Sequence, residues 1–361
     1  MKSIGIDIQA TKGSGTGLAV YTRHLVEALS RESQNGLRFY FYDNPKKGEL
    51  NTIGRLLWEN LELPRLVRSN RLDLLHVPAF APPFQKTCRT IVTVHDLIGM
   101  LFPNQLRWPS RFYWGKWLPG RVKSADALIA DSEHTKRDLV EHLGIHEKKI
   151  TVIYPSGHEG FSPASDPQTR KEIKQRLGIR ERYFLCVGTI EPRKNVARVI
   201  RAFGRFLKQT KNPCFQLVVV GSRQFAHGEV FRSLLREVIL NPKDVCFTDS
   251  LDSQDLNLLY AGAEGLVFAS LYEGFGIPPL EAMASGCPVI ASNVSSVPEV
   301  TGEAAFLVDP YQEDEIARGM LALAEDSDLR KELIQKGFDR IKQFSWQKTA
   351  RETLAVYQSL L

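Results

Sequence analysis

The chain has 361 residues, of which 43% are hydrophobic and 24% are charged, a composition typical of a globular protein and not of a disordered or fibrous one. The net charge of +6 arises within residues 1–160, which hold 22 Lys and Arg against 16 Asp and Glu, whereas residues 161–361 hold 25 of each. This excess indicates an anionic surface or substrate for the first half. It is too small to indicate nucleic acid, and no nucleic-acid-binding motif accompanies it.

Three further features restrict the class of protein. No apolar stretch approaches the ~20 residues of a membrane span, and Asp7 lies where a signal peptide would have its apolar segment. Five cysteines without a Cys-x-x-Cys spacing disfavour a disulfide framework and structural zinc. We therefore expect a cytoplasmic protein.

Short apolar runs of strand length alternate with amphipathic helical patterns along almost the whole chain, which predicts parallel sheets covered by helices on both faces. The alternation stops in a polar stretch at residues 157–167 and then starts again. The expected strands are residues 3–8, 38–42, 72–76, 90–94, 127–130 and 150–154, followed by 183–188, 216–221, 245–248, 265–270, 289–291 and 305–308.

Two series of strands predict an α/β protein with two doubly wound, Rossmann-like domains. The first would span residues 1–160 and the second residues 161–343, with a helix at 344–361. In open parallel sheets, ligands bind beyond the carboxyl ends of the strands. Residues that directly follow the expected strands are therefore the candidates for a functional site.

Two motifs follow strands in the first domain. A glycine-rich turn that includes Gly15 and Gly17 opens onto a helix and suits a phosphate group, although Val20 breaks the dinucleotide-binding pattern. A flexible surface turn is the alternative. His95 and Asp96 follow the strand at 90–94, and Asp96 either orients the imidazole or caps the next segment.

Residues 107–118 interleave three tryptophans with basic residues. This pattern suits the interface of a membrane or a lipid-linked acceptor. A core helix with basic residues on its solvent face explains the pattern equally well. The basic first half favours peripheral contact with an anionic membrane.

The second domain has two motifs at strand ends. Arg193 and Lys194 follow the strand at 183–188 and suit a diphosphate, although a surface charge pair gives the same pattern. Glu273 and Glu281 flank a glycine-bearing loop and a helix start after the strand at 265–270. Ordinary helix capping is the alternative reading of these two acids.

Together these motifs resemble the group 1 (family four) retaining glycosyltransferases, in particular bacterial mannosyl-, rhamnosyl- and fucosyltransferases of surface polysaccharides. The resemblance rests on residues 187–195 and 273–289, and it extends to 295–300, 302–310, 93–97 and the turn at 15–17. It implies the GT-B fold, with an N-terminal acceptor-binding domain, a C-terminal donor-binding domain, and a final helix that packs back on the first domain.

The resemblance also implies roles for individual residues. Glu273 would contact the donor sugar, Glu281 the ribose hydroxyls, and His95 the transferred sugar. Arg193 and Lys194 would neutralise the diphosphate. The remaining donor-binding positions would be Gly15, Gly17, Thr189, Gly274, Phe275 and Gly276.

The family's usual hinge sequence is replaced here by residues 156–159, so His158 becomes a further candidate for the site. The family's usual arginine after Gly188 is replaced by Thr189, which makes Arg193 the expected guanidinium partner of phosphate.

The implied activity is retaining transfer of a hexose or deoxyhexose from a nucleotide sugar, with GDP-mannose as first choice, to a saccharide or polyprenyl-linked acceptor. The family implies no metal and no further cofactor. Two alternatives stay open: a nucleotide-sugar-binding protein without activity, and a GT-B epimerase or phosphorylase. Localisation in the cytoplasm, at the inner face of the membrane, accords with this activity.

Overall fold

The computed structural model describes residues 1–13, 17–32, 36–44, 48–106, 108–163, 166–212, 214–221 and 241–361. Each expected strand is present, with its bounds shifted by at most a few residues. The strands are β1 (Lys2–Asp7), β2 (Leu37–Tyr42), β3 (Leu74–Val77), β4 (Arg89–Val94), β5 (Ala127–Ala130), β6 (Ile150–Val152), β7 (Arg182–Val187), β8 (Phe215–Val220), β9 (Val245–Thr248), β10 (Gly265–Phe268), β11 (Val289–Ser292) and β12 (Ala305–Val308).

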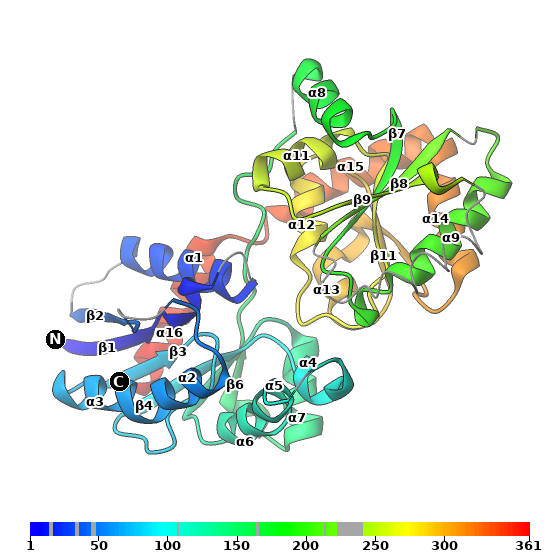
Figure 1. The fold of residues 1–361 in the computed structure, drawn as a ribbon. Coiled ribbons are helices and arrows are strands. Elements are labelled where there is room, and N and C mark those ends of the chain that lie inside the picture. Colours follow the sequence, from blue (N-terminus) through cyan, green and yellow to red (C-terminus); the bar gives the residue numbers. More distant parts are fainter. Residues whose placement is uncertain are drawn as a thin grey trace. The chain divides into compact units, whose positions relative to one another are not determined.

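The strands form two sheets, and every pairing between neighbouring strands is parallel. The first has the order β2-β1-β3-β4-β5-β6 and the second the order β12-β11-β10-β7-β8-β9 (Figure 1). In both sheets the strand order changes direction beside the first strand of the unit, between β1 and β3 in the first sheet and between β7 and β10 in the second. The predicted fold class, two doubly wound α/β units, is therefore confirmed.

The chain divides into two compact units. Unit 1 comprises Met1–Ser156 and Phe344–Leu361, and unit 2 comprises Gly157–Gln343. The crossing from unit 1 to unit 2 thus lies just before the expected boundary at residue 160. The last helix, α16 (Trp346–Leu360), packs against α1 (Gly17–Arg31) in unit 1.

The sheet of unit 1 is covered by helices on both faces. Neighbouring residues of a strand point to opposite faces, so apolar residues in succession supply both layers of the core. Ile4, Ile6 and Ile91 pack with α1 and α16, whereas Val92 and Val94 pack with the helices of the other face. The other described helical segments of this unit are η1 (Gln9–Lys12), α2 (Thr52–Leu57), η2 (Trp58–Glu62), α3 (Leu63–Ser69), α4 (Ile98–Leu101), η3 (Pro103–Gln105), α5 (Ser110–Phe112), η4 (Tyr113–Trp117), α6 (Leu118–Val122), α7 (Glu133–Leu143) and η5 (Glu147–Lys149).

Unit 2 has the same layered arrangement. Phe203 and Phe206 of α9, with Met320 of α14, pack on one face of the sheet in a core that is rich in aromatic rings. The α-helices that the structure describes in this unit are α8 (Pro167–Leu177), α9 (Val196–Gln209), α11 (Ser253–Gly262), α12 (Ile277–Ala284), α13 (Val297–Thr301), α14 (Glu313–Glu325) and α15 (Ser327–Ile341).

Candidate active site

The loops after β7 and β10 bring three charged side chains of unit 2 together. The Glu273 carboxylate accepts a bond from Lys194 Nζ at 2.6 Å and one from Arg193 at 2.9 Å. A second acid, Glu191, lies 2.9 Å from Arg193 Nε. Sequence reasoning assigned these residues to sugar and phosphate separately. The structure adds that the acid and the two cations contact one another.

Burial makes this contact electrostatically strong. The Glu273 side chain is 8% exposed, and those of Arg193 and Lys194 are 14% and 13% exposed. Burial alone would raise the pKa of the Glu273 carboxyl, but the charges of Lys194 and Arg193 outweigh it and hold that pKa below its ordinary value. Glu273 is therefore a carboxylate at neutral pH.

The Lys194 side chain lies next to Gly188, the residue that follows β7. Gly188 has φ +140°, and a Cβ there would lie 3.4 Å from the Lys194 side chain. The Lys194 ammonium also lies 5.3 Å from the centroid of the Phe268 ring. Thr189 follows, and its carbonyl accepts the Glu191 N–H at 2.8 Å. A lysine ammonium has three donors, so Lys194 can contact Glu273 and still donate to a ligand oxygen.

The loop from Glu273 to Gly276 is fixed by two serine hydroxyls. Ser295 Oγ lies 2.6 Å from the Glu273 carbonyl and 2.8 Å from the Glu273 N–H. Ser296 Oγ lies 2.9 and 2.8 Å from the carbonyls of Glu273 and Phe275. The backbone of Gly274 and Phe275 is thus held in place before a ligand arrives. The sequence motif around these serines gave no indication of this task.

The helix that follows the loop begins as predicted but offers fewer donors than expected. Gly276, with φ +103°, precedes α12, and a residue with a side chain is strained in that conformation. Pro278 and Pro279 occupy the first turn and have no N–H. Of the four N–H groups that a helix start leaves without an intrahelical partner, only those of Gly276 and Ile277 are therefore present here.

Glu281 has a partner that the sequence did not reveal. Tyr260 of α11 donates its hydroxyl to Glu281 Oε2 at 2.9 Å. Burial raises the pKa of Glu281 to about 7, although the Tyr260 bond and the Lys194 charge act in the opposite direction. Glu281 therefore titrates near neutral pH, and its remaining oxygen can accept hydrogen bonds from a ligand.

The start of unit 2 approaches the same helix. A Cβ on Gly157 would lie 2.4 Å from the Ile277 side chain, so only glycine fits at this point. Burial lowers the pKa of the neighbouring His158, which favours its neutral form.

In unit 1, His95 follows β4 and lies between two acceptors. Its Nδ1 is 2.5 Å from Asp131 Oδ2, and its Nε2 is 2.8 Å from the Pro78 carbonyl. Both partners accept hydrogen bonds only, so the ring must carry protons on both nitrogens. Burial lowers the pKa of His95, but the charge and hydrogen bond of Asp131 and the bond to Pro78 outweigh it and raise that pKa. His95 is a cation, and the ring of Tyr21 lies edge-on at 4.6 Å.

The acid that orients His95 is Asp131 and not Asp96. Asp96 Oδ1 accepts the Ile98 N–H at 2.8 Å, which is the capping role given above as its alternative. Asp131 follows β5, so the rule that ligand groups follow strands also applies to it. Gly17 is the exposed first residue of α1, whereas Gly15 lies outside the described residues.

The aromatic side chains of the stretch at 107–118 are divided between the core and the surface of unit 1. Tyr113 is buried and Trp114 packs against the core of unit 1, whereas Trp108 is 82% exposed. Within the described ranges no group of His, Cys, Asp or Glu is arranged to hold a metal ion. No helix in these same ranges is long and apolar enough to cross a membrane.

Comparison with known proteins assigns both units to one class of enzyme. Residues 169–340 match the family described as "Glycosyl transferases group 1", and residues 15–156 match the one described as "Glycosyltransferase Family 4". The chain belongs to the group 1 glycosyltransferases. The resemblance that the strand-end motifs carried is therefore confirmed.

This glycosyltransferase has relatives among enzymes of bacterial polysaccharides. It is 27% identical to O-antigen chain mannosyltransferase B of Escherichia coli, over 96% of each chain. It is 29% identical to the serotype-specific mannosyltransferase WbdA of Escherichia coli over 79% of this chain, which amounts to 35% of the length of WbdA.

Solved structures show the fold. Sucrose-phosphate synthase from Thermosynechococcus elongatus has a TM-score of 0.73 at 21% identity, over 100% of this chain and 99% of its own. Anabaena Alr3699/HepE, solved in complex with UDP and glucose, also has a TM-score of 0.73, at 16% identity, over 99% of this glycosyltransferase and 100% of its own chain. The fold is GT-B.

Proposed function

We propose that this glycosyltransferase transfers mannose from GDP-mannose, with retention of configuration, to a saccharide or polyprenyl-linked saccharide acceptor of a surface polysaccharide. The observation that carries the choice of sugar is the similarity to O-antigen chain mannosyltransferase B, which extends over 96% of both chains. A similarity of this extent covers both units, and not only unit 2, which would bind the donor.

The chemistry of unit 2 supports a nucleoside diphosphate as leaving group. The bond to the sugar breaks more easily when the negative charge that develops on the diphosphate is stabilised. Lys194 and Arg193 are cations at the carboxyl ends of the strands, and the backbone N–H groups near Gly276 add donors. These groups supply the stabilisation without a metal ion, so we propose that no metal is required.

Glu273 and Glu281 have separate tasks in this proposal. Glu273 orients the two cations and accepts hydrogen bonds from donor-sugar hydroxyls, while Glu281, held by Tyr260, accepts them from the ribose. His95 faces the transferred sugar with the positive charge of its ring, because both of its N–H groups already donate, one to Asp131 and one to the Pro78 carbonyl. We assign no protein nucleophile.

UDP-glucose is the second candidate donor. The structure of Anabaena Alr3699/HepE has been solved in complex with UDP-glucose, at a TM-score of 0.72 and 16% identity. A non-catalytic binding protein and an epimerase or phosphorylase have less support, because the two relatives described above, which match 96% and 79% of the chain, are named as mannosyltransferases.

Thermal-shift measurements with GDP, UDP and dTDP, and with their sugars, test the donor. A ligand at a hundred times its Kd stabilises the folded state by about 2.7 kcal/mol, so GDP and GDP-mannose should raise Tm by several degrees. Transfer to an oligosaccharide panel, with NMR of the new anomeric centre, then tests retention. Stabilisation by UDP-glucose alone, or a product with inverted configuration, would contradict the proposal.

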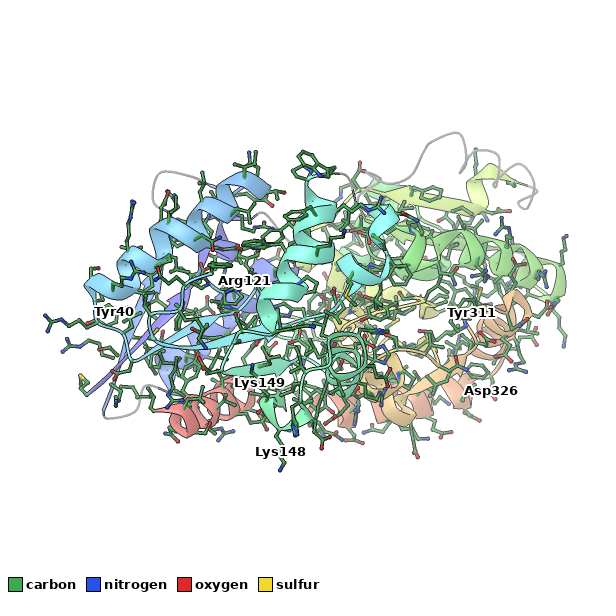
Figure 2. The ribbon with its side chains drawn as sticks, turned by 90° about the horizontal axis from the view of Figure 1, so that it is seen from below. Tyr40, Arg121, Lys148, Lys149, Tyr311 and Asp326 are labelled. Atoms are coloured by element: carbon green, nitrogen blue, oxygen red, sulfur yellow. The ribbon has the colours of Figure 1, made fainter. Side chains whose placement is uncertain are left out.

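We further propose that unit 1 contacts an anionic membrane from the cytoplasmic side. Trp108, Phe84 and Phe112 are exposed by 82%, 69% and 44%. The guanidinium of Arg121, which Figure 2 labels, lies 4.8 Å from the centroid of the Phe84 ring, so a basic residue adjoins one of these exposed rings. Co-sedimentation with anionic but not neutral vesicles, weakened by Trp108→Ser, is the expected result. Equal binding to both kinds of vesicle would argue against it.

A further inference from the structure

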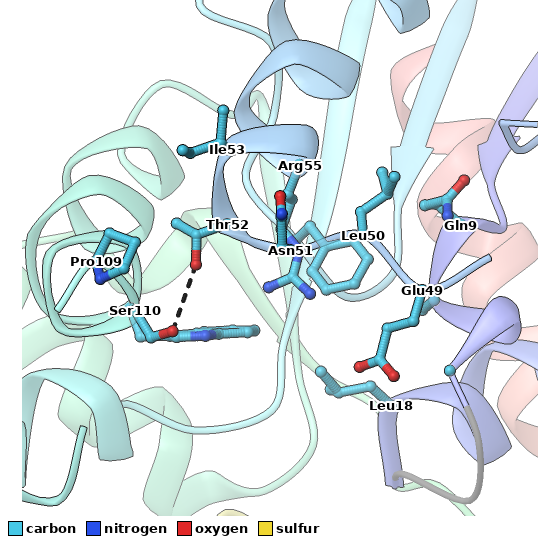
Figure 3. A pocket seen from close by; sticks show the side chains of 14 residues that line it. Gln9, Leu18, Glu49, Leu50, Asn51, Thr52, Ile53, Arg55, Pro109 and Ser110 are labelled. Carbon is cyan, nitrogen blue, oxygen red and sulfur yellow. Dashed lines mark hydrogen bonds between the residues drawn. The ribbon is translucent and has the colours of Figure 1, made fainter. Parts of the chain in front are cut away.

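Unit 1 contains a cavity of about 610 Å³ that none of the roles above uses. It is bounded by the start of α1, by the segment that leads into α2, and by α5 and η4 (Figure 3). Its apolar wall includes Leu18, Leu50, Phe80 and Trp114, and polar groups at its edge include Glu49. Concave sites with an aromatic wall and few polar groups are typical ligand sites.

Among the described residues that line this cavity, Arg55 is the one with a positive charge. Its guanidinium carbon lies 4.0 Å from the centroid of the Phe80 ring and 5.2 Å from those of Tyr113 and Trp114. Three aromatic rings hold the guanidinium in place and reduce its contact with water. Such contacts stabilise the cation but leave its N–H donors available.

No described residue forms an ion pair or a hydrogen bond with the Arg55 guanidinium, and its Nε is buried without a partner among them. The nearest buried acids are engaged elsewhere. Glu59 binds the Tyr113 hydroxyl and the Ala81 N–H, and Asp7 binds the Gln9 N–H and the Trp58 indole.

The charge of Glu59 is also small at neutral pH. Burial raises its pKa to about 8, although the Tyr113 bond and the Arg55 charge oppose this shift, so most of this carboxyl is protonated at pH 7. Burial raises the pKa of Asp7 to about 6. Asp7 is therefore mostly ionised at pH 7 and compensates part of the Arg55 charge from the interior of unit 1, whereas the guanidinium itself faces the cavity (Figure 3).

We propose that this cavity binds the acceptor through an anionic group, a phosphate or a carboxylate carried by a saccharide, which pairs with the Arg55 guanidinium. The planar guanidinium donates two parallel hydrogen bonds to either group. The sugar lies against Trp114 and Phe80, and its hydroxyls donate to the exposed carboxylate of Glu49. This inference rests on the proposed function, because it assumes a saccharide acceptor. It also gives the basic excess of residues 1–160 a specific anionic partner.

Binding to the full-length protein tests this proposal with three probes: mannose 1-phosphate, glucuronic acid and the neutral methyl α-mannoside. Calorimetry gives the affinities, and tryptophan fluorescence reports occupancy next to Trp114. The expected result is at least tenfold tighter binding of one anionic probe than of the neutral one. Preference for the phosphate indicates a phosphorylated or lipid-phosphate-linked acceptor, and preference for the carboxylate indicates an acidic saccharide.

Variants locate the anion. Arg55→Met should abolish the preference for the anionic probe, whereas Arg65→Met removes an exposed arginine of the same unit and should retain it. If Arg55→Met does not fold, Arg55→Lys keeps the charge but not the two parallel bonds and should weaken the anion several-fold. Equal affinities for charged and neutral probes would overturn the proposal. Loss of the preference in Lys194→Met instead of Arg55→Met would also overturn it, because the anion would then occupy unit 2.

The outcome is independent of the donor. Binding of nucleoside diphosphates should not change in Arg55→Met. A failure of the acceptor proposal therefore leaves the donor results unaffected, and the wrong donor leaves the probe affinities unaffected.

Discussion

His95 Nδ1 lies 2.5 Å from Asp131 Oδ2, and this contact joins the loops that follow two neighbouring strands, β4 and β5. The second nitrogen of His95 is occupied by the Pro78 carbonyl, so the carboxylate is what keeps the imidazole charged in a buried place. A cationic histidine donates hydrogen bonds and does not act as a base. The carboxylate therefore decides what His95 can do in the reaction.

Asp131→Asn should lower the pKa of His95, because burial then acts without the opposing charge. A histidine whose pKa is raised in the folded state stabilises the fold. This contribution is complete at pH values below the unfolded-state pKa of about 6.5, and it is lost as pH rises through the folded-state pKa. The variant should therefore lose stability mainly at low pH. Histidine NMR titration and thermal unfolding at pH 5.5 and 8 measure both effects. An unchanged His95 titration would contradict the assignment.

Lys194→Ala should reduce turnover about a hundredfold, by analogy with the removal of one donor to a developing anion. It should also destabilise unit 2 by about 3–5 kcal/mol, since Glu273 would remain buried with one cation fewer.

The double variant Glu273→Gln/Lys194→Met separates these two effects. It should recover much of the lost stability but none of the lost turnover, as measured by urea unfolding and donor kinetics. Full activity in folded Lys194→Ala would exclude a contact between this lysine and the diphosphate.

Nucleoside diphosphate binding should strengthen as pH rises through about 7, because only ionised Glu281 has both oxygens available as acceptors for ribose hydroxyls. Glu281→Gln should bind more weakly at pH 8 and lose this part of the pH dependence. Tyr260→Phe removes the bond at 2.9 Å and should raise the pKa of Glu281, moving the dependence to higher pH. Calorimetry at pH 6, 7 and 8 measures all three proteins. A pH dependence that persists in Glu281→Gln would assign it to the nucleotide itself.

Glu59→Gln should stabilise unit 1 at alkaline pH. The folded protein keeps the Glu59 proton up to about pH 8, whereas the unfolded chain releases it near pH 4.5, so this carboxyl lowers stability as pH rises between these values. The wild type should therefore lose up to ~1.4 kcal/mol per pH unit relative to the variant. Denaturant unfolding at pH 5, 7 and 9 checks the slope. Parallel curves for the two proteins would contradict the neutral state of Glu59.

The strands were predictable because each is a short apolar run between polar turns. The start of α12 was predictable to within one residue, because a proline such as Pro278 is favoured in the first turn of a helix. The motifs at the strand ends were found in the same way, because they directly follow these apolar runs. All of these signals are local in the sequence.

The partners of the site residues were not local and escaped prediction. Tyr260 meets Glu281 because α11 and α12 pack together, and nothing in the sequence near Tyr260 indicates this contact. Arg55 and Trp114 are far apart in the sequence and meet only when η4 packs against α2. Asp131 could have been predicted, because it follows an expected strand, as His95 does.

The return of the chain to unit 1 after residue 343 has a consequence for the order of events during synthesis. Trp346 and Tyr357 belong to the core of unit 1, and the Tyr357 hydroxyl lies 2.6 Å from His76 in β3. The ribosome therefore finishes every residue of unit 2 before it supplies α16. Unit 1, although begun first, completes its core last, and until then β3 and α1 lack the helix that shields them from chaperones and proteases.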